Sequence, residues 1–289
     1  MKKLVKKLTR ILPDKLYLKL MYKRHFHKKL NLKNPQTFNE KLQWLKLYDR
    51  KPIYTTMVDK YAVKKYVSDI LGEEYIIPTL GVWDKFDDID FDKLPNQFVL
   101  KTTHGSGGYN VFICKEKQNF DIAKAKSLME KSLKSDTFWY GREWPYKNVP
   151  KKIIAEKFME DGSGSLVDYK FFCFNGEVKF LYISRGLDHH DTAEISFFDL
   201  DGNETYFSRD DFKRITNFTL PENWEDLKMV ASKLAKQVNV PFIRVDLYSI
   251  NGKIYFSELT FSPCSGYLPF NPKSADLEIG KLLTLPELK

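Results

Sequence analysis

Residues 243–263 read IRVDLYSINGKIYFSELTFSP, a pattern that predicts two β-strands joined at Asn251-Gly252. Ile, Val, Leu, Tyr and Phe recur with a period of two on either side of this turn dipeptide. Arg244, Asp246 and Glu258 interrupt the apolar pattern. Because an unpaired buried charge is costly, three charges in a half-buried hairpin indicate that each has a partner or a ligand.

The length of the turn decides whether the two carboxylates can act together. A two-residue loop would place Asp246 and Glu258 on opposite faces, whereas a three-residue loop with Gly252 in a left-handed bulge places them on one face. Two carboxylates on one face suit Mg²⁺, and a nearby arginine would stabilise developing negative charge. A plain ion network among Arg244, Asp246 and Glu258 is the alternative interpretation.

The composition is that of a globular protein with an uneven charge distribution. The chain has 289 residues, of which 43% are hydrophobic and 15% aromatic, enough for one large domain or two smaller ones. The sequence contains no run of about 18 apolar residues, which argues against a membrane-spanning helix. Residues 1–33 hold 12 of the 47 basic residues and one acid, so they carry the basic character of the whole chain, whose net charge is +9.

This basic N-terminal segment, residues 1–33, spaces Leu4, Leu8, Ile11 and Leu12 at helical intervals among lysines. It lacks the continuous apolar stretch and the cleavage site of a secretory signal. Such a helix can lie on an anionic membrane surface, and a solvated helix packed on the body is the other interpretation. No nucleic acid is expected as a partner, because aromatic residues do not interleave with the basic run.

Cysteine usage indicates a reducing compartment. Cys114, Cys173 and Cys264 are far apart and form no CxxC pair, so neither a disulfide framework nor a zinc site is expected. We therefore expect a cytoplasmic protein, located at the inner membrane surface if the basic segment binds lipid.

Hydrophobic periodicity and turn residues predict an α+β fold. Thr37 and Glu40 fit a capping box that begins a helix. Further helices are expected at residues 59–70, 120–134 and 224–238. Residues 138–150 contain too much Trp, Tyr and Pro for a regular element. Strands are expected at residues 97–103, 109–114 and 152–159, followed by hairpins around Asn175-Gly176 and Asp201-Gly202.

Residues 97–108, QFVLKTTHGSGG, predict a strand that enters a glycine-rich loop. Such a loop brings backbone N–H groups, and here the Lys101 ammonium, close to phosphate oxygens. The lysine precedes the glycines, and no GxGxxG opens a helix, so this is neither a Walker A motif nor a dinucleotide fingerprint. A loop that only turns the chain is the alternative interpretation.

Together these motifs resemble the ATP-grasp superfamily, which implies two α+β lobes that clamp a nucleotide. VDKYAVKKYV at 58–67 and FVLKTTHGSGG at 98–108 look like its two phosphate-lysine segments, and IIAEKFM at 153–159 resembles the adenine hinge of D-alanine–D-alanine ligases. The nucleotide-binding residues that the resemblance implies are Lys60, Lys101, His104, Gly105, Ser106, Gly107, Gly108, Glu156, Lys157, Phe158, Met159, Asp168 and Arg185.

The resemblance also implies individual roles. Glu156 would meet the adenine amino group and Asp168 the ribose. Magnesium would be bound by Asp246, Glu258 and Thr260, although the superfamily commonly has Asn where this chain has Thr260, a weaker oxygen ligand. The catalytic residues implied are Arg244, Lys101 and Lys170. Surface cations are the alternative interpretation of Lys170 and Arg185, and a loop-stiffening hydrogen bond is the alternative for His104.

Within the superfamily, the sequence looks most like the TupA-like branch, which is associated with teichuronopeptide and capsular polysaccharide synthesis. The segments that carry this resemblance are NPQTFNEKLQWLKLYDR at 34–50, WPYKNVPKKIIAEKF at 144–158 and DYKFFCFNGEVKF at 168–180. The resemblance implies an ATP-dependent carboxylate–amine ligase with ATP and Mg²⁺ as cofactors. Its substrates would be a sugar- or polysaccharide-linked carboxylate and an amino acid or amine, joined as an amide through an acyl-phosphate.

The resemblance divides the chain into three parts. Residues 1–57 form a basic arm and helical region, residues 58–160 a first lobe, and residues 161–289 a second lobe. The aromatic side chains of Trp139, Tyr140, Trp144 and Tyr146 suit either stacking on a sugar ring or packing under a lid.

Two other functions remain open from the sequence. A nucleotide-sugar-dependent glycosyltransferase would need a DxD metal motif, whose letters occur at 88–90, 90–92 and 199–201, all in ordinary turn contexts. A non-catalytic ATP-grasp binding module would fit Thr260 and the basic arm. The presence of both lysines, both carboxylates and Arg244 argues against the module.

Overall fold

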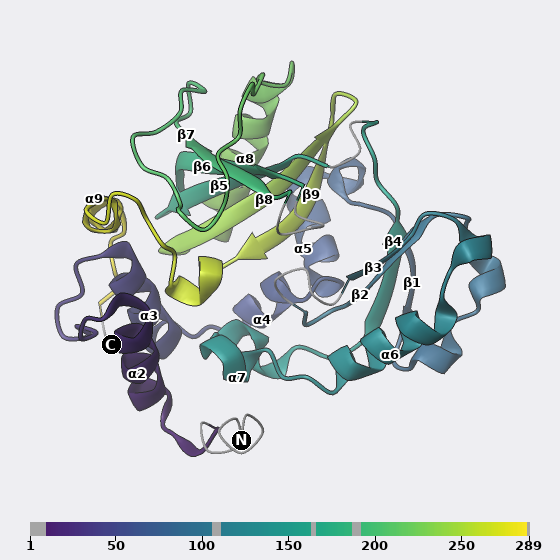
Figure 1. The fold of residues 1–289 in the computed structure, drawn as a ribbon, viewed down its shortest axis with the longest axis horizontal. Helices are drawn as coiled ribbons and strands as arrows, with labels where there is room; N and C mark the ends of the chain where they lie inside the picture. Colours follow the sequence, from purple (N-terminus) through teal and green to yellow (C-terminus); the bar gives the residue numbers. More distant parts are fainter. Residues whose placement is uncertain (1–9, 106–110, 163–165, 187–191, 288–289) are drawn as a thin grey trace.

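The computed structural model describes residues 10–105, 111–162, 166–186 and 192–287. Two antiparallel sheets dominate the fold, and helices cover them (Figure 1). The first sheet has the strand order β1-β4-β2-β3 and the second β7-β6-β5-β8-β9. This architecture confirms the α+β fold that the sequence predicts.

The first sheet carries the strands around the predicted phosphate loop. Its core forms between the sheet and helix α6 (Ile122–Leu133), where Leu100 and Met129 are fully buried. Residues 158–167 then connect β4 to the first strand of the second sheet. The four strands are β1 (Thr79–Trp83), β2 (Phe98–Thr102), β3 (Val111–Cys114) and β4 (Ile153–Lys157).

The second sheet contains one of the two hairpins predicted upstream of residue 243. β5 and β6 meet at Asn175-Gly176, where both residues have positive φ, as predicted. The second predicted hairpin, around Asp201-Gly202, is short: β7 pairs antiparallel with the chain beyond the turn at the bridge of Phe198 with Glu204, but the described residues there form no full second strand. The Asp199 carboxylate accepts the N–H groups of Asp201 and Asn203, which closes the turn, and the Asp199 N–H donates to Asn203 O at 2.9 Å across it. The five strands are β5 (Asp168–Phe174), β6 (Glu177–Arg185), β7 (Glu194–Phe198), β8 (Phe242–Ile250) and β9 (Lys253–Thr260).

The two faces of the second sheet have different covers. Helices α5 (Ala62–Leu71) and α8 (Trp224–Val238) pack on the face that carries Phe171 and Val245. Helices α3 (Phe38–Tyr48) and α9 (Ala275–Leu282) pack on the opposite face, around a cluster of phenylalanines. Since side chains alternate along a strand, Asp168, Lys170, Arg244 and Asp246 share this second face with the phenylalanines.

The N-terminal helices extend the second sheet's side of the molecule: α3 packs on the sheet and α2 packs on α3. The capping box at the start of α3 is confirmed, because Thr37 Oγ1 accepts the Glu40 N–H at 3.2 Å and Glu40 accepts the Thr37 N–H at 3.3 Å. Helix α2 (Asp14–Phe26) packs against α3 through Tyr17, Leu18 and Tyr22. Residues 58–71, which the sequence assigns to the first lobe, pack with the second sheet, together with α4 (Ile53–Val58).

The aromatic segment at 138–150 is more regular than the sequence predicts. It forms the short helix α7 (Phe138–Gly141) and the 3₁₀ helix η5 (Trp144–Asn148), separated by Arg142 in the left-handed conformation. No helix in the described ranges combines the length and apolarity needed to cross a membrane. The remaining 3₁₀ helices are η1 (Glu73–Tyr75), η2 (Phe86–Asp88), η3 (Phe91–Lys93), η4 (Lys117–Asn119) and η6 (Pro263–Gly266).

Candidate active site

The hairpin of β8 and β9 places its two carboxylates on one face by a bulge within a strand. The turn has two residues, Asn251 and Gly252, with φ of 51° and 75°, so the three-residue loop is wrong. Asp246 pairs with Glu258 while Leu247 pairs with Phe256, which leaves Ser257 as an extra residue. This bulge reverses the alternation of β9, so the prediction of a shared face is confirmed.

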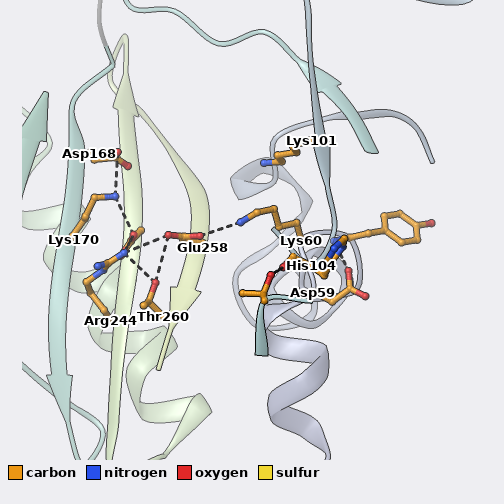
Figure 2. A network of polar contacts seen from close by, with 12 residues as sticks. Asp59, Lys60, Lys101, His104, Asp168, Lys170, Arg244, Glu258 and Thr260 are labelled. Carbon is orange, nitrogen blue, oxygen red and sulfur yellow. Dashed lines mark hydrogen bonds and ion pairs between the residues drawn. The ribbon is translucent and has the colours of Figure 1, made fainter. Parts of the chain in front are cut away.

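Arg244 is the centre of a buried ion network on this face (Figure 2). Its guanidinium donates to Asp246 through Nε at 2.7 Å and through Nη2 at 2.5 Å. Nη2 also donates to Thr260 Oγ1 at 3.0 Å and to Glu258 Oε1 at 3.3 Å. Tyr182 accepts a further bond from Nη1 at 3.0 Å. The three charges that interrupt the hairpin pattern therefore contact one another.

Lys170 extends the network along the sheet. Its ammonium lies 3.0 Å from Asp246 Oδ2 and 3.1 Å from Asp168 Oδ2, and all three side chains are buried. Burial would lower the pKa of Lys170, but the two carboxylates outweigh it and raise that pKa above its usual range. Burial raises the pKa of Asp168, although Lys170 opposes this shift. Lys170 is therefore part of the buried cluster and no surface cation.

A second set of charges comes from the first sheet and from α5. Lys101 Nζ lies 2.5 Å and Lys64 Nζ 2.7 Å from the two oxygens of the buried Glu156 carboxylate. Burial would raise the pKa of Glu156, but the two lysines outweigh it and lower that pKa. The sequence analysis missed Lys64. The available signal was its position four residues after Lys60 in the helix predicted at 59–70, although in the structure Lys60 precedes α5.

Lys60 joins the two sets of charges. It extends from the turn between α4 and α5, and its ammonium lies 3.1 Å from Glu258 Oε2 (Figure 2). Its backbone N–H donates to Thr103 O at 3.0 Å, beside the strand that carries Lys101. Burial opposes the charge of Glu258, yet Lys60, Arg244 and Lys170 together lower the pKa of Glu258. The predicted phosphate lysine and the predicted metal carboxylate are therefore in direct contact.

The start of the glycine-rich loop is anchored to α6. His104 is buried, and its Nε2 lies 3.1 Å from the carbonyl oxygen of Ser132. The His104 carbonyl in turn accepts the Thr137 hydroxyl at 2.8 Å, and the Gly105 N–H donates to Thr102 O at 3.1 Å. These hydrogen bonds hold the start of the loop in place, as the loop-stiffening interpretation of His104 expects. Ser106, Gly107 and Gly108 lie outside the described residues.

The predicted adenine hinge, residues 153–159, consists of β4 and the two residues that follow it. The Lys157 N–H donates to Pro78 O at 3.0 Å, its side chain is exposed, and those of Phe158 and Met159 are partly buried. Arg185 is not brought to this site. Arg185 lies two residues after Ile183, on the face of the second sheet that is opposite to the Lys170 side chain of β5. Its Nε lies 2.5 Å from Glu194.

Sequence analysis also missed Tyr182, which lies opposite Lys170 in the pairing of β5 and β6. A bulge at Lys179 sets this pairing, because Phe172 pairs with Phe180 while Cys173 pairs with Val178. If the pairing is counted from the turn at Asn175-Gly176 without the bulge, Lys170 is given the wrong partner on β6. The alternation of apolar residues contains no signal for this extra residue.

The oxygen atoms around Arg244 fit a divalent cation. Oxygens of Asp246, Glu258 and Thr260 all lie within 3.3 Å of Arg244 Nη2, so one positive charge already draws them together. In the ranges that the structure describes, no three His, Cys, Asp or Glu side chains form a ready metal cage. Magnesium requires less, since one or two carboxylates and substrate phosphates suffice.

Comparisons with known proteins identify the family of the chain. A family profile described as TupA-like ATP-grasp matches residues 40–284. No curated protein sequence matches the chain significantly. Among solved structures, the D-alanine–D-alanine ligase from Helicobacter pylori is 18% identical, with a TM-score of 0.49, and the alignment covers 86% of this chain and 69% of the ligase. The ATP complex of the Bacillus anthracis ligase is also 18% identical, with a TM-score of 0.42 and coverages of 78% and 62%.

The family match and the α+β fold define an ATP-grasp protein. Because the family match extends over most of the 289 residues, the chain belongs to the TupA-like ATP-grasp family. This match, and not the partial overlap with the two D-alanine–D-alanine ligases, carries the assignment.

Proposed function

We propose that this protein is an ATP-dependent carboxylate–amine ligase that uses ATP and Mg²⁺. The observation that carries the proposal is the placement of Lys60, whose ammonium contacts Glu258 and whose backbone N–H donates to Thr103 O, beside the strand of Lys101. Phosphoryl transfer needs positioning and charge neutralisation more than a nucleophilic side chain, and these residues provide both. Membership in the TupA-like ATP-grasp family supports the same chemistry.

Each residue of the site has a role in this proposal. Bound ATP supplies the phosphoryl group that activates the carboxylate, and Asp246, Glu258 and Thr260 would hold the magnesium ion. Lys60 and Lys101 exchange their carboxylate partners for phosphate oxygens when the nucleotide binds. Arg244 stabilises the negative charge that develops on the acyl-phosphate. Lys170 positions Asp246.

The adenine end of the proposed site is formed at the hinge. We assign Glu156 to the adenine amino group and Lys157, Phe158 and Met159 to the surroundings of the ring. Asp168, which the sequence analysis assigned to the ribose, is buried against Lys170 at 3.1 Å. We therefore assign Asp168 to holding Lys170 in place.

The proposed substrates are a carboxylate on a cell-surface polysaccharide or its sugar precursor and an amino acid or amine. The family match supports a carboxylate and an amine in general, and the polysaccharide class is our proposal from the resemblance of the sequence to the TupA-like branch. Trp139 packs on Arg142 at 4.3 Å from ring centroid to guanidinium, and Trp144 packs against the core of the second sheet, so both serve packing. Tyr140 exposes 59% of its surface and remains suited to a sugar ring.

We also propose a cytoplasmic location with α2 on the inner membrane surface. Leu16 and Leu20, one helical turn apart, expose 45% and 51% of their surfaces, while Tyr17 and Leu18 pack inward. Lys15 and Lys19 are exposed next to these leucines. Exposed apolar side chains beside cations suit the boundary of an anionic bilayer.

Thermal unfolding in the presence of nucleotides tests the ligase proposal. Mg-ATP should stabilise the protein by about 2.7 kcal/mol at 100 times its dissociation constant, whereas UDP-sugars should not. Lys101→Ala and Glu258→Ala should abolish ADP release in the presence of a carboxylate and an amine, while Lys131→Ala, an exposed position on α6, should not. Stabilisation by UDP-sugars alone would favour a glycosyltransferase, and stabilisation by neither would favour a binding module.

A further inference from the structure

A buried carboxylate, Glu143, contacts the segment that follows β9, the strand that brings Glu258 and Thr260 to Arg244. The turn after α7 carries it, and its Oε1 accepts the Ser265 hydroxyl at 2.6 Å. Lys46 of α3 holds the two sides of this contact together. Its buried ammonium donates to the carbonyl oxygens of Gly141, at 2.8 Å, and Ser265. We call Lys46, Gly141, Glu143 and Ser265 the Glu143 wall.

The backbone of the Glu143 wall is shaped for this close approach. A Cβ atom at Gly141 would lie 2.5 Å from Ser265 Oγ and 2.8 Å from Glu143 Oε1, so only glycine leaves room for the contact. Cys264 and Ser265 have φ of 49° and 54°, in the left-handed region that residues with a side chain rarely adopt. Such conformations cost free energy and persist where the surroundings impose them, often at functional sites.

The Glu143 wall is electrostatically coupled to the proposed phosphoryl-transfer site. Burial raises the pKa of Glu143, and the nearby Glu258 carboxylate raises it further, while Lys46, Ser265 and Arg244 oppose the shift. Burial and the Glu143 and Glu258 carboxylates likewise raise the pKa of Tyr146, on the same segment. Geometry links the two places as well, because Ser265, which bonds to Glu143, follows by five residues Thr260, whose hydroxyl accepts from Arg244 at 3.0 Å.

We propose that Glu143, oriented by Ser265, binds the cationic amine substrate of the ligase. The inference rests on the proposed function, in which the second step joins an amine to an acyl-phosphate beside Arg244. A buried carboxylate is a strong partner for an ammonium group such as the α-amino group of an amino acid. Lys46 compensates the charge of Glu143 when no amine is bound.

The chemistry of the second step explains why a carboxylate is needed there. The amine nitrogen forms a bond to the acyl carbon, and the bond from that carbon to the phosphate oxygen breaks, which releases inorganic phosphate. The proton that the ammonium group must lose passes to the Glu143 carboxylate. A general base in this position typically contributes about 10²–10⁴-fold to the rate.

Hydroxylamine separates amine binding from the first step. It is uncharged at neutral pH, so it captures an acyl-phosphate as a hydroxamate without a site for an ammonium group. The wild-type enzyme, Glu143→Gln and Ser265→Ala are each incubated with Mg-ATP and one of three carboxylates: glucuronate, galacturonate or UDP-glucuronate. Each reaction then receives either hydroxylamine or a mixture of amino acids, and hydroxamate and amide are measured by mass spectrometry.

Glu143→Gln should lower the ratio of amide to hydroxamate by about 100-fold or more. Ser265→Ala, which leaves the carboxylate present but unoriented, should lower it less. Glu40→Gln is the matched control, because Glu40 is also buried but caps α3. This control should keep the wild-type ratio even if its melting temperature falls.

The possible failures are distinguishable. A wild-type ratio in Glu143→Gln, or an equal loss of amide and hydroxamate, would overturn the amine site and leave the ligase proposal standing. No hydroxamate from the wild-type enzyme with any of the three carboxylates would overturn the proposed function with these carboxylates, and the amine site with it.

Discussion

Replacement of Asp246 by Asn removes the charge that holds the Arg244 network together. Asp246 is fully buried, and its carboxylate accepts two bonds from Arg244, at 2.7 and 2.5 Å, and one from Lys170 at 3.0 Å. Asparagine has nearly the same shape but no charge. Asp246→Asn therefore leaves two buried cations without their shared partner.

The expected cost follows from the partners that remain. Removing one member of a buried ion pair typically destabilises a protein by about 3–5 kcal/mol. Lys170 keeps Asp168 at 3.1 Å, and Arg244 keeps Glu258 at 3.3 Å. We therefore expect the free energy of unfolding to fall by about 4 kcal/mol, a large part of the roughly 5–15 kcal/mol typical of a folded domain.

Urea denaturation measures this effect in the wild-type protein, Asp246→Asn, the double variant Arg244→Met/Asp246→Asn and the surface control Asp88→Asn. Asp88→Asn, at an exposed position of η2, is the surface control and should change the free energy of unfolding by less than about 0.5 kcal/mol. Adding Arg244→Met to Asp246→Asn removes one uncompensated cation and should recover about 2 kcal/mol. A loss below about 1 kcal/mol in Asp246→Asn, or no recovery in the double variant, would refute the ion network as the stabilising unit.

Two further predictions concern pH and lipid. The pKa of Glu258 is lowered from an ordinary value of 4.5, so its stabilisation is complete above that pH and is lost as the pH falls. Below about pH 4.5 the free energy of unfolding of the wild-type protein should fall with pH more steeply than that of Glu258→Gln, by up to about 1.4 kcal/mol per pH unit. Equal slopes of unfolding free energy against pH in the two proteins would contradict this prediction. On vesicles rich in phosphatidylglycerol, Lys15→Gln/Lys19→Gln should bind about 2 kcal/mol more weakly than the wild-type protein in a sedimentation assay, whereas Lys233→Gln/Lys236→Gln on α8 should match it. Equal wild-type binding to neutral vesicles, or binding to RNA in preference to vesicles, would count against the membrane surface.

Features with a local cause could be predicted from the sequence. Thr37 and Glu40 are three residues apart and satisfy each other's backbone N–H groups, so the start of α3 needs no distant contact. The apolar stripe at 224–238 likewise predicts α8 within its observed bounds. The aromatic segment at 138–150 shows the limit of this reasoning, because α7 and η5 are stabilised by packing on other helices.

The sequence by itself determined that the hairpin carries interacting charges, because Arg244, Asp246 and Glu258 stand out against an apolar pattern. Only the tertiary structure decided how they meet. Bulges at Ser257 and Lys179 reverse the alternation of two strands, and hydrogen bonding between strands sets their positions. Lys60 reaches Glu258, nearly 200 positions later, while Arg185 faces away with Glu194. Such pairings depend on how helices and sheets pack together, and no local pattern of residue types encodes that packing.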